Sequence, residues 1–338
     1  MLTFANDSHI QYHYMKGKDI LNRRFFIGSL GAFAGINPLP LFSEENAISI
    51  VATTSMIADT ARSIGQGYVK VKGLMGPGID PHSYRHTRND IVSMTKADLT
   101  LRHGLDLEAQ MEDFFADLSR KRSVVAVTNT INPKELLDYP GQTGRYDPHV
   151  WMDPILWSLV TDQIALALSN AKPAKRDEFQ TSATNYKSVL NELNNYAKNV
   201  LSSVPSKSRV LVTAHDAFGY FGKIYGFEVI GVQGISTNSE AGLYRIKEIV
   251  DLLVQREISA VFVESSVSDR NMRALIEGAT ARGHEVTLGG ELYSDAMGTE
   301  GTYEGTYVGM LDHNITTIAK ALGGTPPDFG WQGKLKAT

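Results

Sequence analysis

"KRDEFQTSATNYKSVLNELNNYAKNVLSSV", residues 175–204, decides the fold that we predict for this chain. Its apolar and aromatic side chains recur at the spacing of one helix face, at Phe179, Tyr186, Val189, Leu190, Leu193, Tyr196, Val200 and Leu201. A helix of about 28 residues is roughly 40 Å long, which is enough to run the length of a domain. Because the heptad of a coiled coil is not sustained, the segment predicts one long helix that joins two parts of the chain.

Short runs rich in β-branched residues alternate with helix-period segments on both sides of this helix. The candidate strands lie in "AISIVATTSM", "VKVKGLM", "ADLTLRH", "SVVAVTN", "SRVLVTAH", "FEVIGVQGI", "ISAVFVESS" and "HEVTLGG". This alternation is typical of α/β layers with parallel sheets. We therefore predict an α/β fold of two lobes, each with a largely parallel sheet flanked by helices, joined by one long rigid helix. The predicted boundaries are 47–174 for the N-terminal lobe, 175–204 for the helix and 205–338 for the C-terminal lobe.

The bulk composition excludes several classes of protein. The 338 residues suffice for two domains, and 42% hydrophobic with 21% charged residues is typical of a soluble globular protein. A formal net charge of -4, without a basic run among aromatics, excludes nucleic acid and anionic lipid as general partners. The chain has no cysteine, so only histidine and carboxylate ligands remain for a transition metal.

Residues 1–46 have the layout of an export segment. In "LNRRFFIGSLGAFAGINPLPLF", residues 21–42, an arginine pair precedes an apolar stretch that is too short and interrupted to span a bilayer. The pair Arg23-Arg24 followed by Phe26 resembles a twin-arginine signal. We expect removal near Ser43 to Ala47, a periplasmic location and, without cysteine, no lipid anchor. A plain N-terminal extension is the alternative.

The tripeptide Asp-Pro-His occurs twice, at residues 80–82 and 147–149. Proline fixes its own φ and holds the preceding residue extended, so His82 and His149 are each carried on a rigid loop. His215 and Asp295 follow other candidate strands, and ligands of α/β sheets collect beyond the carboxyl ends of strands. Three imidazoles and one carboxylate suit Zn²⁺ and tolerate Mn²⁺ or Fe²⁺. Each histidine taken singly also fits a structural role, and the repeated tripeptide favours a shared role for the first two.

Five segments resemble, in order, the motifs of the zinc/manganese solute-binding proteins that serve ABC importers: "GIDPHSYRHTRNDI", "YDPHVWMDP", "LVTAHDAFGYF", "VFVESSVS" and "LYSDAMG" with "GTYVGMLDHNITTIAKAL". The resemblance implies two lobes bridged by a rigid helix, with one metal buried between them. It implies His82 and His149 as ligands from the first lobe, and His215 and Asp295 from the second. It also implies a monomer that carries Zn²⁺ or Mn²⁺ as its transported ligand to an ABC permease.

Two departures bear on the metal. Residues 110–146 contain no histidine, whereas many zinc-specific relatives have a histidine-rich loop between the first two ligands. A manganese- or iron-specific receptor of the same family is therefore an alternative. His215 stands where manganese-preferring relatives commonly place glutamate, which favours zinc. Because histidine must be deprotonated to bind, we predict that affinity falls steeply below about pH 6.

The other candidates receive supporting or structural roles. We expect a solvated loop position for His86, a supporting or structural role for His103, and no chemistry from His284 and His313. Asp80, Asp147 and Asp153 either accept hydrogen bonds from ligand histidines or cap loops. Glu264 follows another strand and is expected to line the cleft.

Two other classes of function compete with the receptor. A secreted zinc metallohydrolase would keep three protein ligands, an open water position, and Asp295 or Glu264 as base. Asp295 as fourth ligand would fill that position, so we predict a binding protein and not an enzyme. A surface adhesin rests on the family resemblance alone.

Overall fold

The structure, a computed structural model, describes residues 47–336. The predicted export segment, residues 1–46, lies outside the described residues. Within them, eight strands form two four-stranded sheets in which every pairing is parallel. The strands of the first sheet are β1 (Ile48–Ala52), β2 (Val69–Gly73), β3 (Leu99–Arg102) and β4 (Val124–Ala126). Those of the second are β5 (Val210–Thr213), β6 (Glu228–Gly231), β7 (Ala260–Glu264) and β8 (Thr287–Leu292). The α/β class and the eight candidate strands are confirmed.

Both sheets have the same strand arrangement, β2-β1-β3-β4 in the first and β6-β5-β7-β8 in the second. The helices around the first sheet are α1 (Ser55–Gly65), α2 (Arg88–Lys96), α3 (Glu112–Ser119) and α4 (Pro154–Ala171). Those around the second are α6 (Gly219–Tyr225), α7 (Leu243–Gln255), α8 (Arg270–Thr280) and α9 (Tyr307–Ala321). Because all carboxyl ends of a parallel sheet lie on one edge, each lobe gathers its strand-following loops at that edge.

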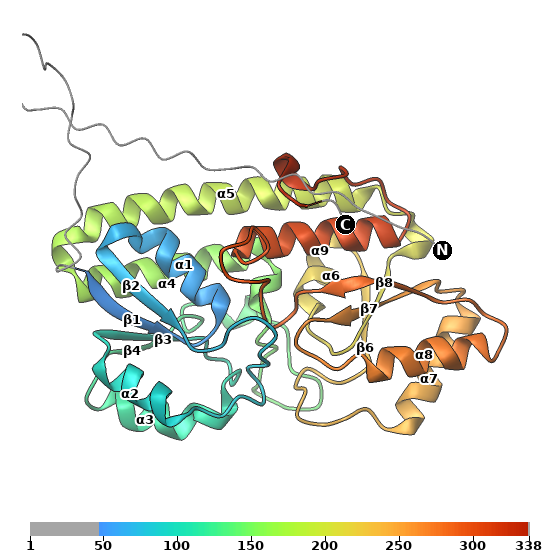
Figure 1. The fold of residues 1–338 in the computed structure, drawn as a ribbon, viewed down its shortest axis with the longest axis horizontal. Helices are drawn as coiled ribbons and strands as arrows, with labels where there is room; N and C mark the ends of the chain where they lie inside the picture. The colour runs from blue at the N-terminus through green and yellow to red at the C-terminus, as the bar shows by residue number, and fades with distance from the viewer. Residues whose placement is uncertain (1–46, 337–338) are drawn as a thin grey trace, which may run out of the picture. The chain divides into compact units, whose positions relative to one another are not determined.

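The predicted long helix is α5 (Arg176–Ser202), which links the two lobes. Its apolar face is buried as expected at Phe179, Leu190 and Leu193, whereas Val189 is 36% exposed. The helix does not stand free, because α1, α4 and α9 all pack against it. Figure 1 shows α5 running past both sheets, with α4 and α9 beside it.

In the inner strands β1 and β7, successive side chains pack into two different cores. In β1, Ile50 packs toward the α5 side, while Val51 packs with α2 and α3. In β7, Phe262 packs toward the α5 side, while Val261 packs with α7 and α8. The α5 side is one cluster of buried side chains that includes residues of both sheets and of α1, α4, α5, α6 and α9. The outer face of each sheet has a core of its own.

No helix among residues 47–336 is both long and apolar enough to cross a membrane.

Candidate metal centre

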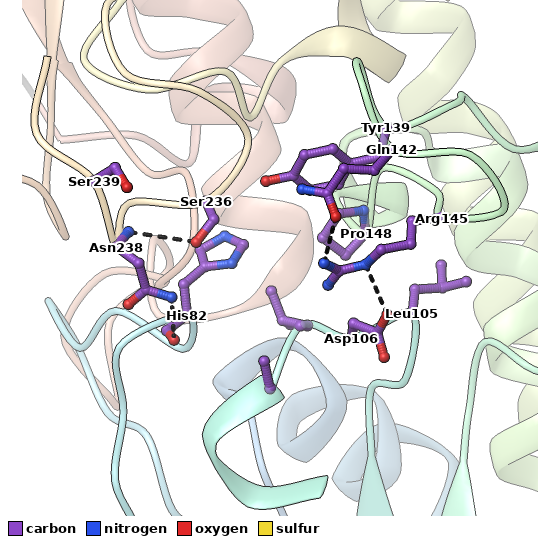
Figure 2. A pocket seen from close by; sticks show the side chains of 12 residues that line it. His82, Leu105, Asp106, Tyr139, Gln142, Arg145, Pro148, Ser236, Asn238 and Ser239 are labelled. Atoms are coloured by element: carbon purple, nitrogen blue, oxygen red, sulfur yellow. Dashed lines mark hydrogen bonds and ion pairs between the residues drawn. The ribbon is translucent and has the colours of Figure 1, made fainter.

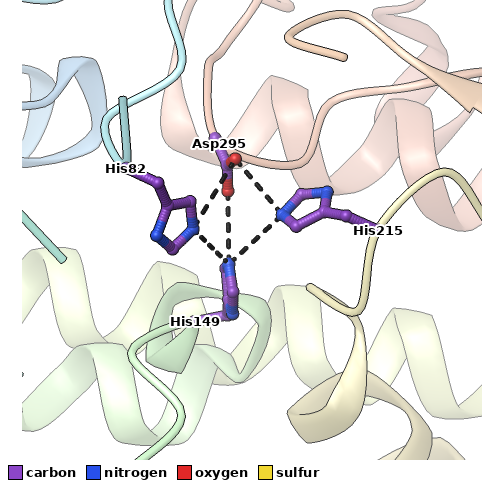
Figure 3. Close-up of side chains that lie close together, drawn as sticks. All are labelled: His82, His149, His215 and Asp295. Atoms are coloured by element: carbon purple, nitrogen blue, oxygen red, sulfur yellow. Dashed lines mark hydrogen bonds and ion pairs between the residues drawn. The ribbon is translucent and has the colours of Figure 1, made fainter. Parts of the chain in front are cut away.

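Four loops bring the sequence-predicted ligands together. His82 follows β2, His149 lies between β4 and α4, His215 follows β5, and Asp295 follows β8. One ligand atom of each lies within 4.8 Å of the others, and all four residues are buried. Figure 3 shows the three imidazole rings directed at the Asp295 carboxylate, with His82 and His149 from the first lobe and the other two from the second.

The spacing of these atoms fits a metal ion. His149 Nε2 lies 3.2 Å from His82 Nε2 and 3.4 Å from His215 Nε2. Asp295 lies 3.2 Å from His215 Nε2 and 3.4 Å from His149 Nε2. Four ligands placed tetrahedrally at about 2.0–2.1 Å from Zn²⁺ would stand about 3.3–3.4 Å from one another. These four separations are therefore close to those of a four-coordinate zinc site, whereas His82 Nε2 and Asp295 Oδ2 are farther apart, at 4.0 Å.

The Asp295 carboxylate has no hydrogen-bond partner in the described structure. Both of its oxygens are buried and neither accepts a hydrogen bond, although histidine nitrogens lie near them. Leaving an ionised carboxylate buried without directed partners is costly. A cation between Asp295 and the three Nε2 atoms would remove that cost, so the residues fit a divalent metal.

Residues 50–321 match the model of a protein family, ZnuA, described as zinc-uptake complex component A, periplasmic. The chain belongs to the ZnuA family. The resemblance found in the sequence is thus confirmed.

Proteins similar to this chain are named for different metals. The chain is 49% identical to the manganese-binding lipoprotein MntA of Bacillus subtilis over 280 residues, 83% of this chain and 91% of that protein. It is 30% identical to the iron-binding protein YfeA of Yersinia pestis over 298 residues, 86% of this chain and 94% of that protein. The solved structure of the periplasmic zinc-binding protein TroA from Treponema pallidum superposes with a TM-score of 0.80. That structure has 47% identity and covers 82% of this chain and 99% of its own.

Two carboxylates orient two of the imidazoles in this ZnuA-family chain. Asp147 Oδ1 accepts hydrogen bonds from His149 Nδ1 at 2.6 Å and from the His149 backbone N at 2.9 Å. Glu264 accepts from His215 Nδ1 at 2.5 Å and from the His215 backbone N at 2.8 Å. A proton held on Nδ1 leaves the Nε2 lone pair free, so both rings present their ligand atom to the centre.

Without metal, the centre pairs a carboxylate with charged imidazoles. Burial alone would lower the pKa of His149, but Asp147 and Asp295 outweigh it and raise that pKa to about 9. The pKa of His215 is also raised well above its usual value, because Asp295 and Glu264 outweigh burial. Burial would raise the pKa of Asp295, yet His215 and His149 hold it well below its usual range. For His82 burial dominates and lowers the pKa to about 4.

Asp80 and Asp153 support the site in another way from Asp147. Asp80 accepts from the His82 backbone N at 2.8 Å and from Ser83 Oγ at 2.8 Å, which fixes the loop and not the ring. Asp153 caps α4 by accepting from the backbone N of Ile155 at 2.7 Å. Of the three candidate acceptors, only Asp147 contacts the imidazole of a candidate ligand.

The remaining described histidines lie outside the group of four. His103 is fully buried and donates from Nε2 to the carbonyl oxygen of Pro148 at 2.7 Å, so it supports the loop of His149 from behind. Its burial lowers its pKa to about 3. His86 is partly buried and stacks on Phe114 with ring centroids 4.9 Å apart, where we had expected a solvated residue. His284 and His313 contact backbone carbonyls of other segments.

The hydrogen bonds that join the two lobes around the centre were not predicted from the sequence. Trp151 donates from Nε1 to the carbonyl oxygen of Ser294 at 2.7 Å, which ties the loop of His149 to that of Asp295. Tyr220 of α6 donates its hydroxyl to the carbonyl oxygen of Asp147 at 2.8 Å. A buried indole or phenol usually has a hydrogen-bond partner, and this preference was the only feature of the sequence that indicated these bonds.

Proposed function

We propose that the chain is an extracytoplasmic receptor that captures Zn²⁺ or Mn²⁺ between its two lobes and delivers the ion to an ABC permease. His82, His149, His215 and Asp295 are the proposed ligands. The observation that carries the proposal is the convergence of three Nε2 atoms and a buried carboxylate at metal-ligand spacing, with no hydrogen bond to either oxygen of that carboxylate. The metal is cargo here and not a resident cofactor.

We propose that zinc binds more tightly than manganese. Three imidazole nitrogens suit Zn²⁺, whereas Mn²⁺ prefers oxygen ligands and stands lower in the divalent affinity series. The names of MntA, YfeA and TroA refer to manganese, iron and zinc, so the family itself serves more than one metal. Manganese or iron therefore remains the alternative cargo in the cell.

The same geometry argues against a hydrolase. A catalytic zinc keeps an open position for water, whereas four protein side chains converge on this centre. Glu264 is not free to act as a base, because it accepts hydrogen bonds from the ring and the backbone of His215. The four ligands are at most 4% exposed, which leaves a large substrate no approach to the ion.

A calorimetric titration of the metal-free protein with Zn²⁺, repeated with excess Mn²⁺, tests the proposal. We expect one tight zinc site that His215→Ala weakens at least about a hundredfold and that excess Mn²⁺ competes for weakly. His313→Ala is the matched control, because His313 lies on α9 outside the group. Absence of a tight site would refute the receptor, and binding unaffected by His215→Ala would refute the ligand set.

Three further points belong to the proposal. We propose export to the periplasm, through a twin-arginine type signal in residues 1–46, and action as a monomer. We also propose the lobe boundaries 47–174, 175–204 and 205–338, which are supported by β1 to β4 preceding α5 and β5 to β8 following it. Sedimentation of the loaded protein tests the monomer, and the N-terminal residue of the exported chain tests the cleavage.

A further inference from the structure

The loop that carries His82 is tied to the second lobe differently from the loops of the other ligands. Around His149 and Asp295 the ties are buried, as in the bond from Trp151 to Ser294. The His82 loop is held at the rim of the cleft by two partly buried bonds. Thr237 Oγ1 donates to Asp80 Oδ2 at 2.6 Å, and Asn238 Nδ2 donates to the carbonyl oxygen of His82 at 3.3 Å.

Asp80 is the junction of these contacts. One of its oxygens accepts from the His82 backbone N at 2.8 Å, and the other accepts from Ser83 at 2.8 Å and from Thr237. The Asp80 carboxylate therefore stabilises the turn at His82 and also accepts the hydrogen bond from Thr237 of the second lobe. A displacement of Thr237 would act directly on the turn that aims the His82 imidazole.

A cavity of about 260 Å³ lies beside this contact. Its lining includes His82 and Pro148 from the first lobe and Ser236, Asn238 and Ser239 from the second. Figure 2 shows Ser236, Asn238 and Ser239 on the same side of this space as His82, with Tyr139, Gln142 and Arg145 on the opposite side. His149, His215 and Asp295 are not among the lining residues, so the cavity reaches the centre on its His82 side.

We propose that Thr237 is a positioning residue that holds the His82 loop against the second lobe and thereby sets how fast the metal leaves. This inference rests on the proposed function, because it assigns the release step of the same site. A hydroxyl that donates to a carboxylate makes a charge-assisted bond, which is among the stronger single hydrogen bonds. Its loss would let the His82 loop separate from the second lobe more often while the other three ligands keep their buried supports.

The test compares metal release from variants at this contact. Zn²⁺-loaded protein is mixed with excess chelator, and the loss of zinc is followed in time. Thr237→Val removes the hydroxyl at nearly constant shape and is expected to speed release about tenfold. Thr237→Ser keeps the hydroxyl and should release zinc like the wild type. Thr184→Val, the same change at an exposed position of α5, is the matched control and should have no effect.

A cycle with Asp80→Asn separates positioning from a general structural role. Asp80→Asn should also speed release, and adding Thr237→Val to it should change the rate by less than about twofold, because the two groups act through one bond. The thermal midpoint of the metal-free Thr237→Val protein should stay within about 2 °C of the wild type.

Three results would overturn the inference. The first is an unchanged rate of zinc release in Thr237→Val. The second is a double variant whose release rate is increased by the product of the two single-variant factors. The third is a thermal midpoint of metal-free Thr237→Val that falls by clearly more than about 2 °C, because faster release would then reflect a general loss of stability. A wild-type protein that takes up no Zn²⁺ would overturn the proposed function and this inference with it. Tight binding by the wild type with any of the first three results refutes only the role of Thr237.

Discussion

His215 Nδ1 donates a hydrogen bond to Glu264 Oε2 at a distance of 2.5 Å, and both side chains are buried at the carboxyl end of the second sheet. The first lobe repeats this relationship with His149 and Asp147 at 2.6 Å. In the first lobe the partners are two residues apart, whereas in the second His215 follows β5 and Glu264 is the last residue of the neighbouring strand β7. Each lobe therefore supplies one imidazole whose orientation is set by a carboxylate of the same lobe.

Glu264→Ala should weaken zinc binding about 10- to 100-fold, because the His215 ring loses the acceptor that fixes its tautomer and direction. Glu264→Gln keeps an acceptor oxygen and should lose less. Calorimetric titration measures both, and Glu291→Ala at an exposed position of β8 is the control. Unchanged affinity in Glu264→Ala would show that His215 needs no orientation by this residue.

Zinc binding should release protons at neutral pH. Since the pKa of His149 is about 9 and that of His215 is also raised, both rings are protonated at pH 7 until the metal displaces their protons. Affinity should then fall about tenfold per pH unit for each proton displaced, beginning below pH 9 and not below pH 6 as the sequence alone suggested. Titrations in two buffers with different ionisation enthalpies count the protons, and equal heats in both would contradict the prediction.

The metal-free protein should be most stable near pH 6.5. Because the folded-state pKa of His149 is raised from 6.5 to about 9, its contribution is complete below pH 6.5 and is lost as the pH rises through 9. The pKa of His82 is lowered to about 4, so the unfolded chain takes up this proton first and stability falls between pH 6.5 and 4. Thermal unfolding from pH 4 to 9 tests this maximum. Stability that keeps rising to pH 9 without metal would show that His149 is not held charged.

Tyr220→Phe should lower the free energy of unfolding by about 1–3 kcal/mol, because it leaves buried backbone groups unpaired. Its hydroxyl accepts from the backbone N of Leu137 at 3.0 Å and donates to the carbonyl oxygen of Asp147 at 2.8 Å. Tyr244→Phe is the matched control, since Tyr244 is 82% exposed and should change stability by less than about 0.5 kcal/mol. Denaturant unfolding of the metal-free proteins compares the two variants. If both lost the same free energy of unfolding, the hydrogen bonds of the Tyr220 hydroxyl would make no specific contribution to stability.

Local patterns in the sequence predicted the elements and the four converging residues, but not their supports. The strands could be read because β-branched runs such as "VFVE" are local signals, and His82 and His149 stand out through the repeated tripeptide. The helix spacing of residues 175–204 predicted α5, and only the exposed Val189 departs from its buried face. The role of Glu264 as the acceptor of His215 was not predicted, because it depends on which strands are neighbours.

The contacts between the two lobes could not be predicted from local sequence patterns either, because their partners are far apart in the chain. Thr237 and Asp80 are 157 positions apart, and Trp151 and Ser294 are 143 apart. Asp80 stands out through the repeated tripeptide, but nothing local in the sequence indicates Thr237 as its partner, or Ser294 as the partner of Trp151. Such pairings follow from the packing of two lobes, which is fixed only when both sheets and α5 are in place.

The cluster of buried side chains on the α5 side has a consequence for how the molecule folds. Since Ile50 and Phe262 belong to one cluster with α5 and α9, neither lobe can complete its interior alone. We expect a single cooperative unfolding transition, with a calorimetric enthalpy equal to the van't Hoff enthalpy. A chain divided after residue 204 should give two aggregating halves and not two independently folding modules. Metal captured at one edge would then protect the whole molecule from unfolding at once.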